Sequence, residues 1–528
     1  MTYAEFVKRS ISPLIAIVVA FGFAASSCSS SSSSIDVISQ DTVDEGTVTS
    51  DAPTTASPNT STAGSNTTYS TSAFATPTIS WDSCGTGLEC GYIEVPINYD
   101  DVNSDTTALY IVRHAATDAS ARIGSLLVNP GGPGFGGSYL AEAADNIFSQ
   151  SILSSFDIIG WDPRGTGASI PAIDCTEDYD RYFASGDITP DTEQERADIV
   201  ASSEEFTQAC FDNNGDLLPY VGTNNVARDM DMIRRALGED KISYFGFSYG
   251  SELGATWTTM FPETVRAAVL DGASDPNVDD LVGTLQQNKG FEESIATFLA
   301  NCSADSSCAF HNDGNAEGAF DDLMEQLDEN PISTSSGRPD LTRGMALTAV
   351  AQAMYSDSYW SYLEDALASA QAGDGTDLLS LYDEYFQRQA DGTYGNELEA
   401  FLNILCADNP DRMTVEEADE LVPQYQANAP RFSPGTTGDY TCVFWPKALD
   451  PRIKITGKGA GPIVVIGTTG DAATPLASTR NMVKALEEGR LIVVTAEQHT
   501  GYNVNSCVNE AVDNYLIDLQ APDGELDC

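Results

Sequence analysis

Short runs of apolar residues recur along the chain and predict the strands of a largely buried sheet. Two early segments, residues 92–99 and 108–113, alternate apolar and polar positions, which is typical of antiparallel strands. The later runs are almost continuously apolar, and they occupy residues 125–129, 156–161, 242–245, 265–270, 461–467 and 491–495. Continuous runs favour parallel strands covered on both faces, so the pattern predicts a mostly parallel sheet with an antiparallel beginning.

The pattern changes to that of several helices between residues 276 and 451. Expected helices in this block include residues 345–354, 360–371 and 377–387. Because strand-like runs resume afterwards, the block is predicted to be an insertion that covers the sheet. The prediction is therefore an α/β fold with a doubly wound sheet and a helical lid. Its expected parts are a core of residues 79–275 and 455–528 and a lid of residues 276–454.

The beginning of the chain does not fit this pattern. Two basic residues precede the apolar run 11–25, so residues 1–28 are predicted to be a secretory signal. Small residues precede Cys28 as in the lipidation site of bacterial lipoproteins, which predicts a lipid anchor on the outer face of the membrane. The usual leucine three places earlier is alanine here, so simple secretion is the alternative. Residues 29–78 are rich in Ser and Thr and predict a flexible tether, with the folded part starting near residue 79.

The amino-acid composition disfavours several classes of binding partner. The chain has 79 acidic and 25 basic residues, a formal net charge of −54, so repulsion disfavours nucleic acids and anionic membrane surfaces. Such an excess keeps a protein soluble outside the cell, and attraction of cationic peptides is the alternative. No Cys-x-x-Cys pair and only three histidines occur in the sequence, so we expect no zinc or other metal site and no cofactor.

Ten cysteines besides Cys28 indicate an oxidising compartment. Their spacing suggests that neighbours pair, although spacing alone leaves other connectivities open. The expected pairs are Cys84 with Cys90, Cys175 with Cys210, Cys302 with Cys308, Cys406 with Cys442, and Cys507 with Cys528.

The candidate nucleophile lies where a predicted strand meets a predicted helix. In Gly246-Phe-Ser-Tyr-Gly250, glycines flank Ser248 at a turn too tight for Cβ atoms. Gly-x-Ser-x-Gly also occurs by chance, because it fixes only three positions. The strand before it and the helix after it favour a nucleophile elbow that exposes the Ser248 hydroxyl.

A serine nucleophile needs a neighbouring base, which a carboxylate holds in one tautomer. His499 follows the last apolar run and is the one histidine C-terminal to both the elbow and the lid, so it is the expected base. Asp471 follows the preceding run and is the expected acid. Asp271, at another strand end, and Glu497, close to the histidine, are the alternatives. Thr474 is either a brace for the Asp471 turn or an ordinary turn residue.

Negative charge that develops on a substrate carbonyl must meet fixed N–H donors. We expect one donor to be the amide of Tyr249, directly after the nucleophile, and the other to be a glycine amide in the turn 131–134. The same glycines in a nucleotide-phosphate loop would be followed by a Lys-Ser or Lys-Thr pair, which is missing.

Five motifs in this order resemble the secreted tripeptidyl aminopeptidases of actinobacteria, relatives of prolyl aminopeptidase among the α/β-hydrolases. The motifs are Asn-Pro-Gly-Gly-Pro-Gly, Trp-Asp-Pro-Arg-Gly-Thr-Gly, Gly-Phe-Ser-Tyr-Gly-Ser, Gly-Asp-Ala-Ala-Thr-Pro and His-Thr-Gly-Tyr. The likeness covers nearly everything after about residue 80 and includes the closing Cys528. A departure is Phe135, where many members have glycine, and we expect it to narrow the cleft.

The resemblance implies Ser248 as nucleophile, Asp471 and His499 as its partners, and oxyanion donors at Gly131, Gly132 and Tyr249. It also implies a lid that recognises the free amino terminus of a peptide. The expected function is therefore a serine exopeptidase that releases short peptides, with tripeptides as the expected product, through an acyl-enzyme. A carboxylesterase with the same triad and an inactive peptide-binding surface lipoprotein are the alternatives. Carboxylates of the lid would bind the amine, and the candidates are Glu364, Asp365, Asp383, Glu384, Glu397, Glu399 and Asp408.

Overall fold

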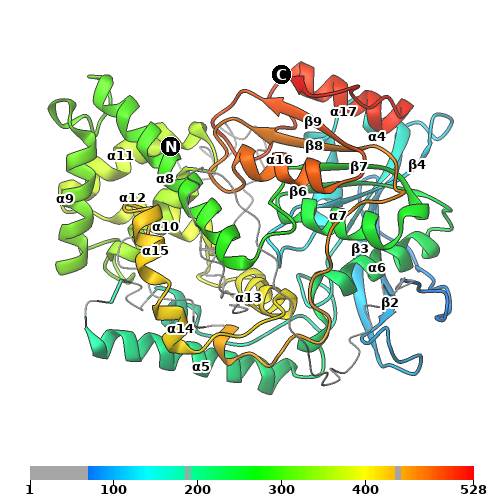
Figure 1. Cartoon of the computed structure of the whole chain (residues 1–528), viewed down its shortest axis with the longest axis horizontal. Helices are drawn as coiled ribbons and strands as arrows, with labels where there is room; N and C mark the ends of the chain where they lie inside the picture. Colours follow the sequence, from blue (N-terminus) through cyan, green and yellow to red (C-terminus); the bar gives the residue numbers. More distant parts are fainter. Residues whose placement is uncertain (1–68, 185–188, 191, 434–439, 441) are drawn as a thin grey trace, which may run out of the picture.

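Ten strands form one sheet within the described part of the computed structural model, which comprises residues 69–184, 189–190, 192–433, 440 and 442–528. The spatial order is β1-β2-β3-β5-β4-β6-β7-β8-β9-β10 (Figure 1). The strands are β1 (Asp82–Gly85), β2 (Leu88–Pro96), β3 (Thr106–His114), β4 (Gly124–Asn129), β5 (Phe156–Trp161), β6 (Ile242–Phe247), β7 (Val265–Asp271), β8 (Ile463–Thr468), β9 (Gly489–Val494) and β10 (Leu526–Asp527).

The sheet has an antiparallel beginning and a parallel remainder, as the apolar pattern predicts. β1, β2, β3 and β5 pair antiparallel in turn, whereas every pairing from β5 to β10 is parallel. Strands β4, β5 and β6 are buried at every position, which explains why their sequences are continuously apolar. The carboxyl ends of the parallel strands therefore meet along one edge of the sheet, where the candidate site lies.

Helices cover both faces of the sheet and produce two separate hydrophobic clusters. One cluster includes apolar residues of α6 (Thr223–Ala236), α7 (Tyr249–Met260) and α16 (Leu476–Ala485). The other includes residues of α2 (Ser138–Glu142), α3 (Ala144–Ile147), α4 (Gln150–Ser155) and α17 (Ser506–Asp518). This three-layer arrangement, with helices on both faces of a mostly parallel sheet, is the α/β-hydrolase fold expected from the sequence.

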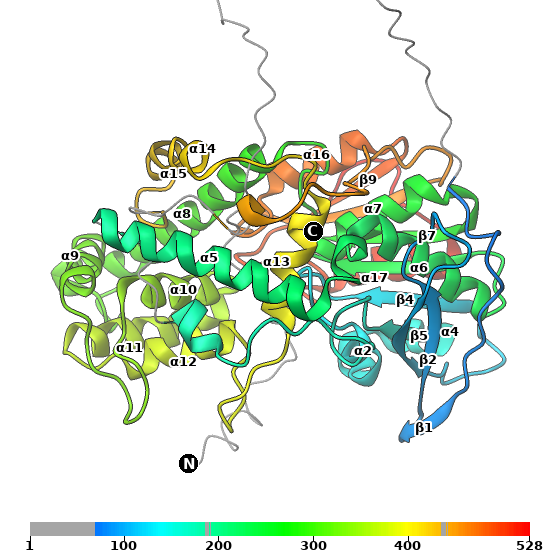
Figure 2. The ribbon, with the colours of Figure 1, turned by 90° about the horizontal axis from the view of Figure 1, so that it is seen from below.

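The lid has its own hydrophobic cluster, built mainly from helices beyond one end of the sheet (Figure 1). The helices of the lid are α8 (Asp280–Ala304), α9 (Ala316–Glu329), α10 (Arg343–Ala353), α11 (Trp360–Gln371), α12 (Thr376–Tyr385), α13 (Glu397–Asp408), α14 (Val415–Asp419) and α15 (Val422–Asn428). A further helix, α5 (Glu193–Asn214), precedes the elbow in the chain but runs alongside the lid in Figure 2. Its Phe206 and Cys210 share a cluster with Ile404 and Cys406 of α13, so the expected range 276–454 does not contain everything that packs with the lid.

One expected boundary differs from the structure. Residues upstream of 79 already belong to the folded part, because buried Thr71 bonds Asp231 and its carbonyl accepts a bond from Arg235. Helix α6 begins at Thr223. Its first amide is bound by a lid carboxylate, not by a local side chain. The predicted signal, Cys28 and most of the predicted tether lie outside the described residues.

Five disulfides join neighbouring cysteines: Cys84 with Cys90, Cys175 with Cys210, Cys302 with Cys308, Cys406 with Cys442, and Cys507 with Cys528. These are the five pairs that the spacing suggests. In the part of the chain that the structure describes, no helix is both long enough and apolar enough to cross a membrane.

Candidate active site

Ser248 occupies the turn between β6 and α7 in a strained backbone conformation. Its φ and ψ are 54° and −126°, values that a residue with a Cβ rarely adopts. The turn is so tight that a Cβ placed on Gly246 would lie 2.2 Å from the carbonyl oxygen of Gly250, which explains the flanking glycines. The Ser248 amide donates a 2.8 Å bond to the Asp271 carbonyl, which joins the elbow to the end of β7.

Asp471 and His499 meet at the ends of β8 and β9. The imidazole Nδ1 lies 2.9 Å from each carboxylate oxygen of Asp471, and both side chains are buried. This pairing holds the neutral imidazole with its proton on Nδ1, so that Nε2 is the acceptor. His499 Nε2 is buried and has no hydrogen-bond partner among the described residues. Gly272 lies against the imidazole of His499. The residue before it is Asp271, whose carbonyl oxygen accepts the bond from the Ser248 amide. The elbow and His499 therefore lie at the same strand end, that of β7.

The alternative acid, Asp271, has a different set of partners. Its two carboxylate oxygens accept bonds of 2.7 and 2.8 Å from the amides of Gly501 and Tyr502, just after His499. Burial raises the pKa of Asp271 to about 6, although the two amides oppose this shift. Among the described residues, the acid paired with the His499 ring is Asp471, and neither Asp271 nor Glu497 contacts it in this way.

Thr474 links the two members of that pair. Its hydroxyl donates to Asp471 Oδ2 at 2.9 Å and lies 3.2 Å from His499 Nδ1. The amides of Ala473 and Thr474 donate to Asp471 Oδ1 at 3.0 and 2.8 Å. The sequence leaves open whether Thr474 is a brace or an ordinary turn residue. These contacts favour the interpretation that Thr474 supports the Asp471 carboxylate.

The geometry distinguishes among the expected oxyanion donors. The Gly131 amide donates to the Asn129 side chain at 3.0 Å, so this N–H is already occupied. The next amide in the turn, that of Gly132, has no acceptor among the described residues. Tyr249 is the first residue of α7, and its amide therefore has no acceptor within the helix. The pair that remains for a developing oxyanion is Gly132 and Tyr249, both of which line the cavity at Ser248.

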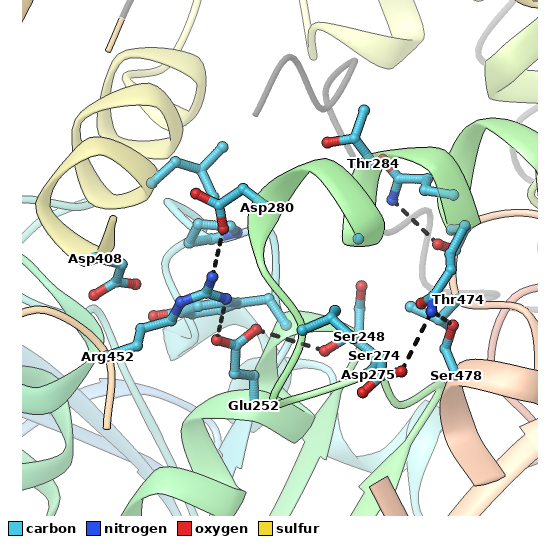
Figure 3. A pocket seen from close by; sticks show the side chains of 18 of the residues that line it. Ser248, Glu252, Ser274, Asp275, Asp280, Thr284, Asp408, Arg452, Thr474 and Ser478 are labelled. Atoms are coloured by element: carbon cyan, nitrogen blue, oxygen red, sulfur yellow. Dashed lines mark hydrogen bonds and ion pairs between the residues drawn. The ribbon is translucent and has the colours of Figure 1, made fainter. Parts of the chain in front are cut away.

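One wall of that cavity carries a cluster of charge (Figure 3). Arg452 binds Glu252 and Asp280 with distances of 2.6 Å each. Buried Asp408 adjoins them, and its carbonyl accepts a bond from the Arg452 amide. Burial raises the pKa of Asp408 to about 7.

Of the seven lid acids proposed from sequence, Asp408 is the one that lines this cavity. Asp383 pairs instead with Arg338, and Glu399 accepts bonds from the amides of Cys175 and Thr176. Sequence reasoning missed Glu252, Asp280 and Arg452. A signal existed for Glu252, because it lies four residues after Ser248 and hence one helical turn along the elbow helix.

Comparisons with known proteins agree with this geometry. Residues 429–528 match a family model described as TAP-like protein. The chain is 36% identical over 461 residues to serine protease Hip1 of Mycobacterium tuberculosis, which covers 84% of this chain and 87% of the relative. It is 28% identical over 458 residues to a tripeptidyl aminopeptidase of Streptomyces lividans, covering 83% and 84%. The chain belongs to the TAP-like family of α/β-hydrolases.

This TAP-like protein is accordingly a serine hydrolase. Another relative bears the name Carboxylesterase B, from Mycobacterium tuberculosis, and is 35% identical over 479 residues, covering 86% of this chain and 90% of its own. Relatives named as peptidase and as esterase thus resemble the TAP-like chain to similar extents. The names of the relatives therefore do not decide between a peptide and an ester substrate, and the residues that line the cavity at Ser248 are the evidence for this choice. Among the described residues, no group of three or more His, Cys, Asp or Glu side chains could hold a metal ion.

Proposed function

We propose that the protein is a serine exopeptidase that removes short peptides, tripeptides in the expected case, from free amino termini through an acyl-enzyme. The observation that carries the proposal is the charge of the cavity at Ser248. Glu252 and Asp280 bind the guanidinium of Arg452, and the carboxyl of Asp408 lies beside this cluster. A negative wall of this kind favours a protonated amine and disfavours an uncharged acyl chain.

The chemical steps follow from the contacts around Ser248. The hydroxyl attacks the carbonyl carbon of the scissile bond while His499 Nε2 accepts its proton, and Asp471 stabilises the imidazolium. The amides of Gly132 and Tyr249 donate to the resulting oxyanion. The imidazolium then protonates the leaving amine, which leaves an acyl-serine. Water activated by the same base hydrolyses this ester and restores the enzyme.

Ser248→Ala tests the core of the proposal. The variant should fold normally but lose turnover and labelling by a fluorophosphonate, because the hydroxyl makes the covalent bond and adds little to the core. Wild-type rates in this variant would refute the assignment. Absence of labelling in the wild-type protein would favour the inactive binding protein.

Blocking the amine tests the substrate class. Acetylating the amino terminus of a good peptide substrate should lower kcat/KM by about a hundredfold, because the carboxylates then face an uncharged group. Asp280→Asn should reduce cleavage of the free peptide and spare a small activated ester. The matched control is Glu293→Gln on the same helix, since Glu293 is exposed and pairs with Lys289.

Equal cleavage of free and acetylated peptides would contradict the exopeptidase and favour a carboxylesterase. That alternative has specific support, because the same triad serves both reactions and a similar relative is named Carboxylesterase B. Secretion, and an anchor through Cys28, complete the proposal. Mass spectrometry of the mature amino terminus would test both.

A further inference from the structure

The helix α13 lies between the rest of the lid and the hydrolase core, and it borders the cavity from Phe401 to its carboxyl end. In Figure 2 it stands between the other lid helices and the core. Phe401, Leu405 and Asp408 line the cavity from successive turns of this helix. Their spacing of three and four residues places them on one face, so a single rigid element contributes one whole side of the cavity.

The carboxyl end of α13 is linked to the side chain of Tyr249 through Thr223. Asp408 Oδ2 accepts a 2.5 Å bond from the Thr223 hydroxyl, and Oδ1 accepts a 2.7 Å bond from the Thr223 amide. Because the Thr223 proton is used for the carboxylate, the Tyr249 hydroxyl, 2.5 Å away, is the donor to Thr223 Oγ1. Buried Asp408 and Thr223 thus fix the orientation of the partly buried Tyr249 side chain, whose backbone amide follows Ser248.

The amino end of α13 holds the other half of the oxyanion site. A Cβ on Gly134 would lie 2.4 Å from the Glu397 carbonyl oxygen and 2.6 Å from the Phe401 amide, so the glycine turn rests directly on the first turn of α13. The next residue, Phe135, is buried in the hydrophobic cluster of the lid. It does not line the cavity at Ser248, which corrects the expectation that it narrows the cleft.

We propose that α13 is a positioning helix that sets the distance between the two oxyanion donors, with Asp408 and Thr223 acting through the hydroxyl of Tyr249. The inference rests on the proposed acyl transfer at Ser248 and not on the choice between peptide and ester. Both donors must lie within hydrogen-bond distance of the same developing oxyanion, and small displacements reduce the rate. One helix that rests against the glycine turn and is linked through Thr223 to Tyr249 fixes the separation of the two donors before substrate binds.

Removing single hydroxyl groups tests the inference. Tyr249→Phe keeps the backbone amide but removes the bond to Thr223, and Thr223→Val removes the same link from the other side. Each should lower kcat about tenfold for both a free peptide and a small activated ester, with KM nearly unchanged. Thr223→Ser retains the hydroxyl and should restore kcat. Tyr515→Phe is the control, because it removes a buried tyrosine hydroxyl far from the cavity and should lower stability but not kcat.

The outcomes separate the inference from the proposed function. Wild-type kcat in both Tyr249→Phe and Thr223→Val, or equal losses in Thr223→Ser and Thr223→Val, would overturn the role of the hydroxyl link. An ester-cleaving enzyme that ignores peptides but shows the expected pattern of kcat would support the inference and refute the exopeptidase. A wild-type protein that cleaves neither substrate and resists fluorophosphonate would overturn both.

Discussion

The ends of β7 and β8 carry similar residues with different tasks. Asp271 is the last residue of β7, and Asp471 lies in the turn after β8. Both aspartates are buried, and both bind His499 or the residues just after it. Asp471, in the turn after β8, binds the imidazole, whereas Asp271, at the end of β7, binds the backbone amides of Gly501 and Tyr502. One carboxylate fixes the tautomer of the ring and the other fixes the path of the loop. A strand end next to a histidine therefore does not by itself identify the acid of a triad.

The largest expected effect that would separate the two aspartates is that of Asp471→Asn. An amide at this position can neither stabilise the imidazolium nor hold the proton on Nδ1, so kcat should fall by about 10⁴-fold. Steady-state kinetics on a small ester would measure the loss, and circular dichroism would confirm that the variant folds. A larger loss in the Asp271 variant would transfer the acid role.

Asp271→Asn should have an intermediate effect. Asparagine keeps one acceptor for the loop but turns an N–H₂ group towards a backbone amide, which leaves that amide unpaired. The His499 loop should then shift, lowering kcat by about ten- to a hundredfold and lowering the unfolding temperature as well. A purely local turn residue would change neither quantity, so the two measurements together distinguish the roles.

Thr474→Val removes one of the bonds that hold Asp471 and should lower kcat less than either aspartate variant. The change removes the hydroxyl bond to Asp471 Oδ2 but leaves the two amide bonds to Oδ1, so we expect kcat to fall by several-fold. Thr474→Ser retains the hydroxyl and should keep most of the activity. Equal losses in both variants would indicate that the methyl group, not the hydroxyl, supports the site.

The smallest effect concerns stability and extends the comparison to other buried acids. Burial raises the pKa of Asp271 to about 6 and the pKa values of Glu399 and Asp408 to about 7. A carboxyl with a raised pKa in the folded state stabilises the fold most when protonated, and this contribution is lost as pH rises from about 4 to 7. The unfolding temperature should therefore fall between pH 5 and pH 8. Glu399→Gln should reduce the loss of unfolding free energy over this pH range by on the order of 1 kcal/mol, because glutamine keeps the acceptor without the charge.

The core is predictable because burial constrains its sequence strongly. The strands β4 and β5 have no exposed position, so their apolar runs are unambiguous. The elbow at Ser248 needs glycine on both sides, and the chain order of serine, acid and base follows from strand order. The order of motifs along the chain therefore predicts the pairing of Asp471 with His499, and the two side chains lie 2.9 Å apart in the structure.

Apart from Asp408, the charges of the cavity wall could not be predicted, because they come from three distant segments. Glu252 lies on α7, Asp280 begins α8, and Arg452 lies near the end of the lid, so no sequence spacing connects them. Acidic residues are also too frequent in this chain for any one to be selected. Likewise α5 escapes a pattern search, since few of its residues are buried. The loss of Gly131 as a free donor depends on the bond that its amide donates to the Asn129 side chain, which only the folded turn reveals.

The burial of Phe135 in the lid has a practical consequence for protein engineering. A lid exchanged between two related hydrolases would normally be joined at the loops that enter and leave the insertion. Here the glycine turn of the core sends a side chain into the hydrophobic cluster of the lid, so such a graft would expose Phe135 or leave a void. Residues 131–135 should therefore be transplanted together with the lid, as one unit of specificity and catalysis.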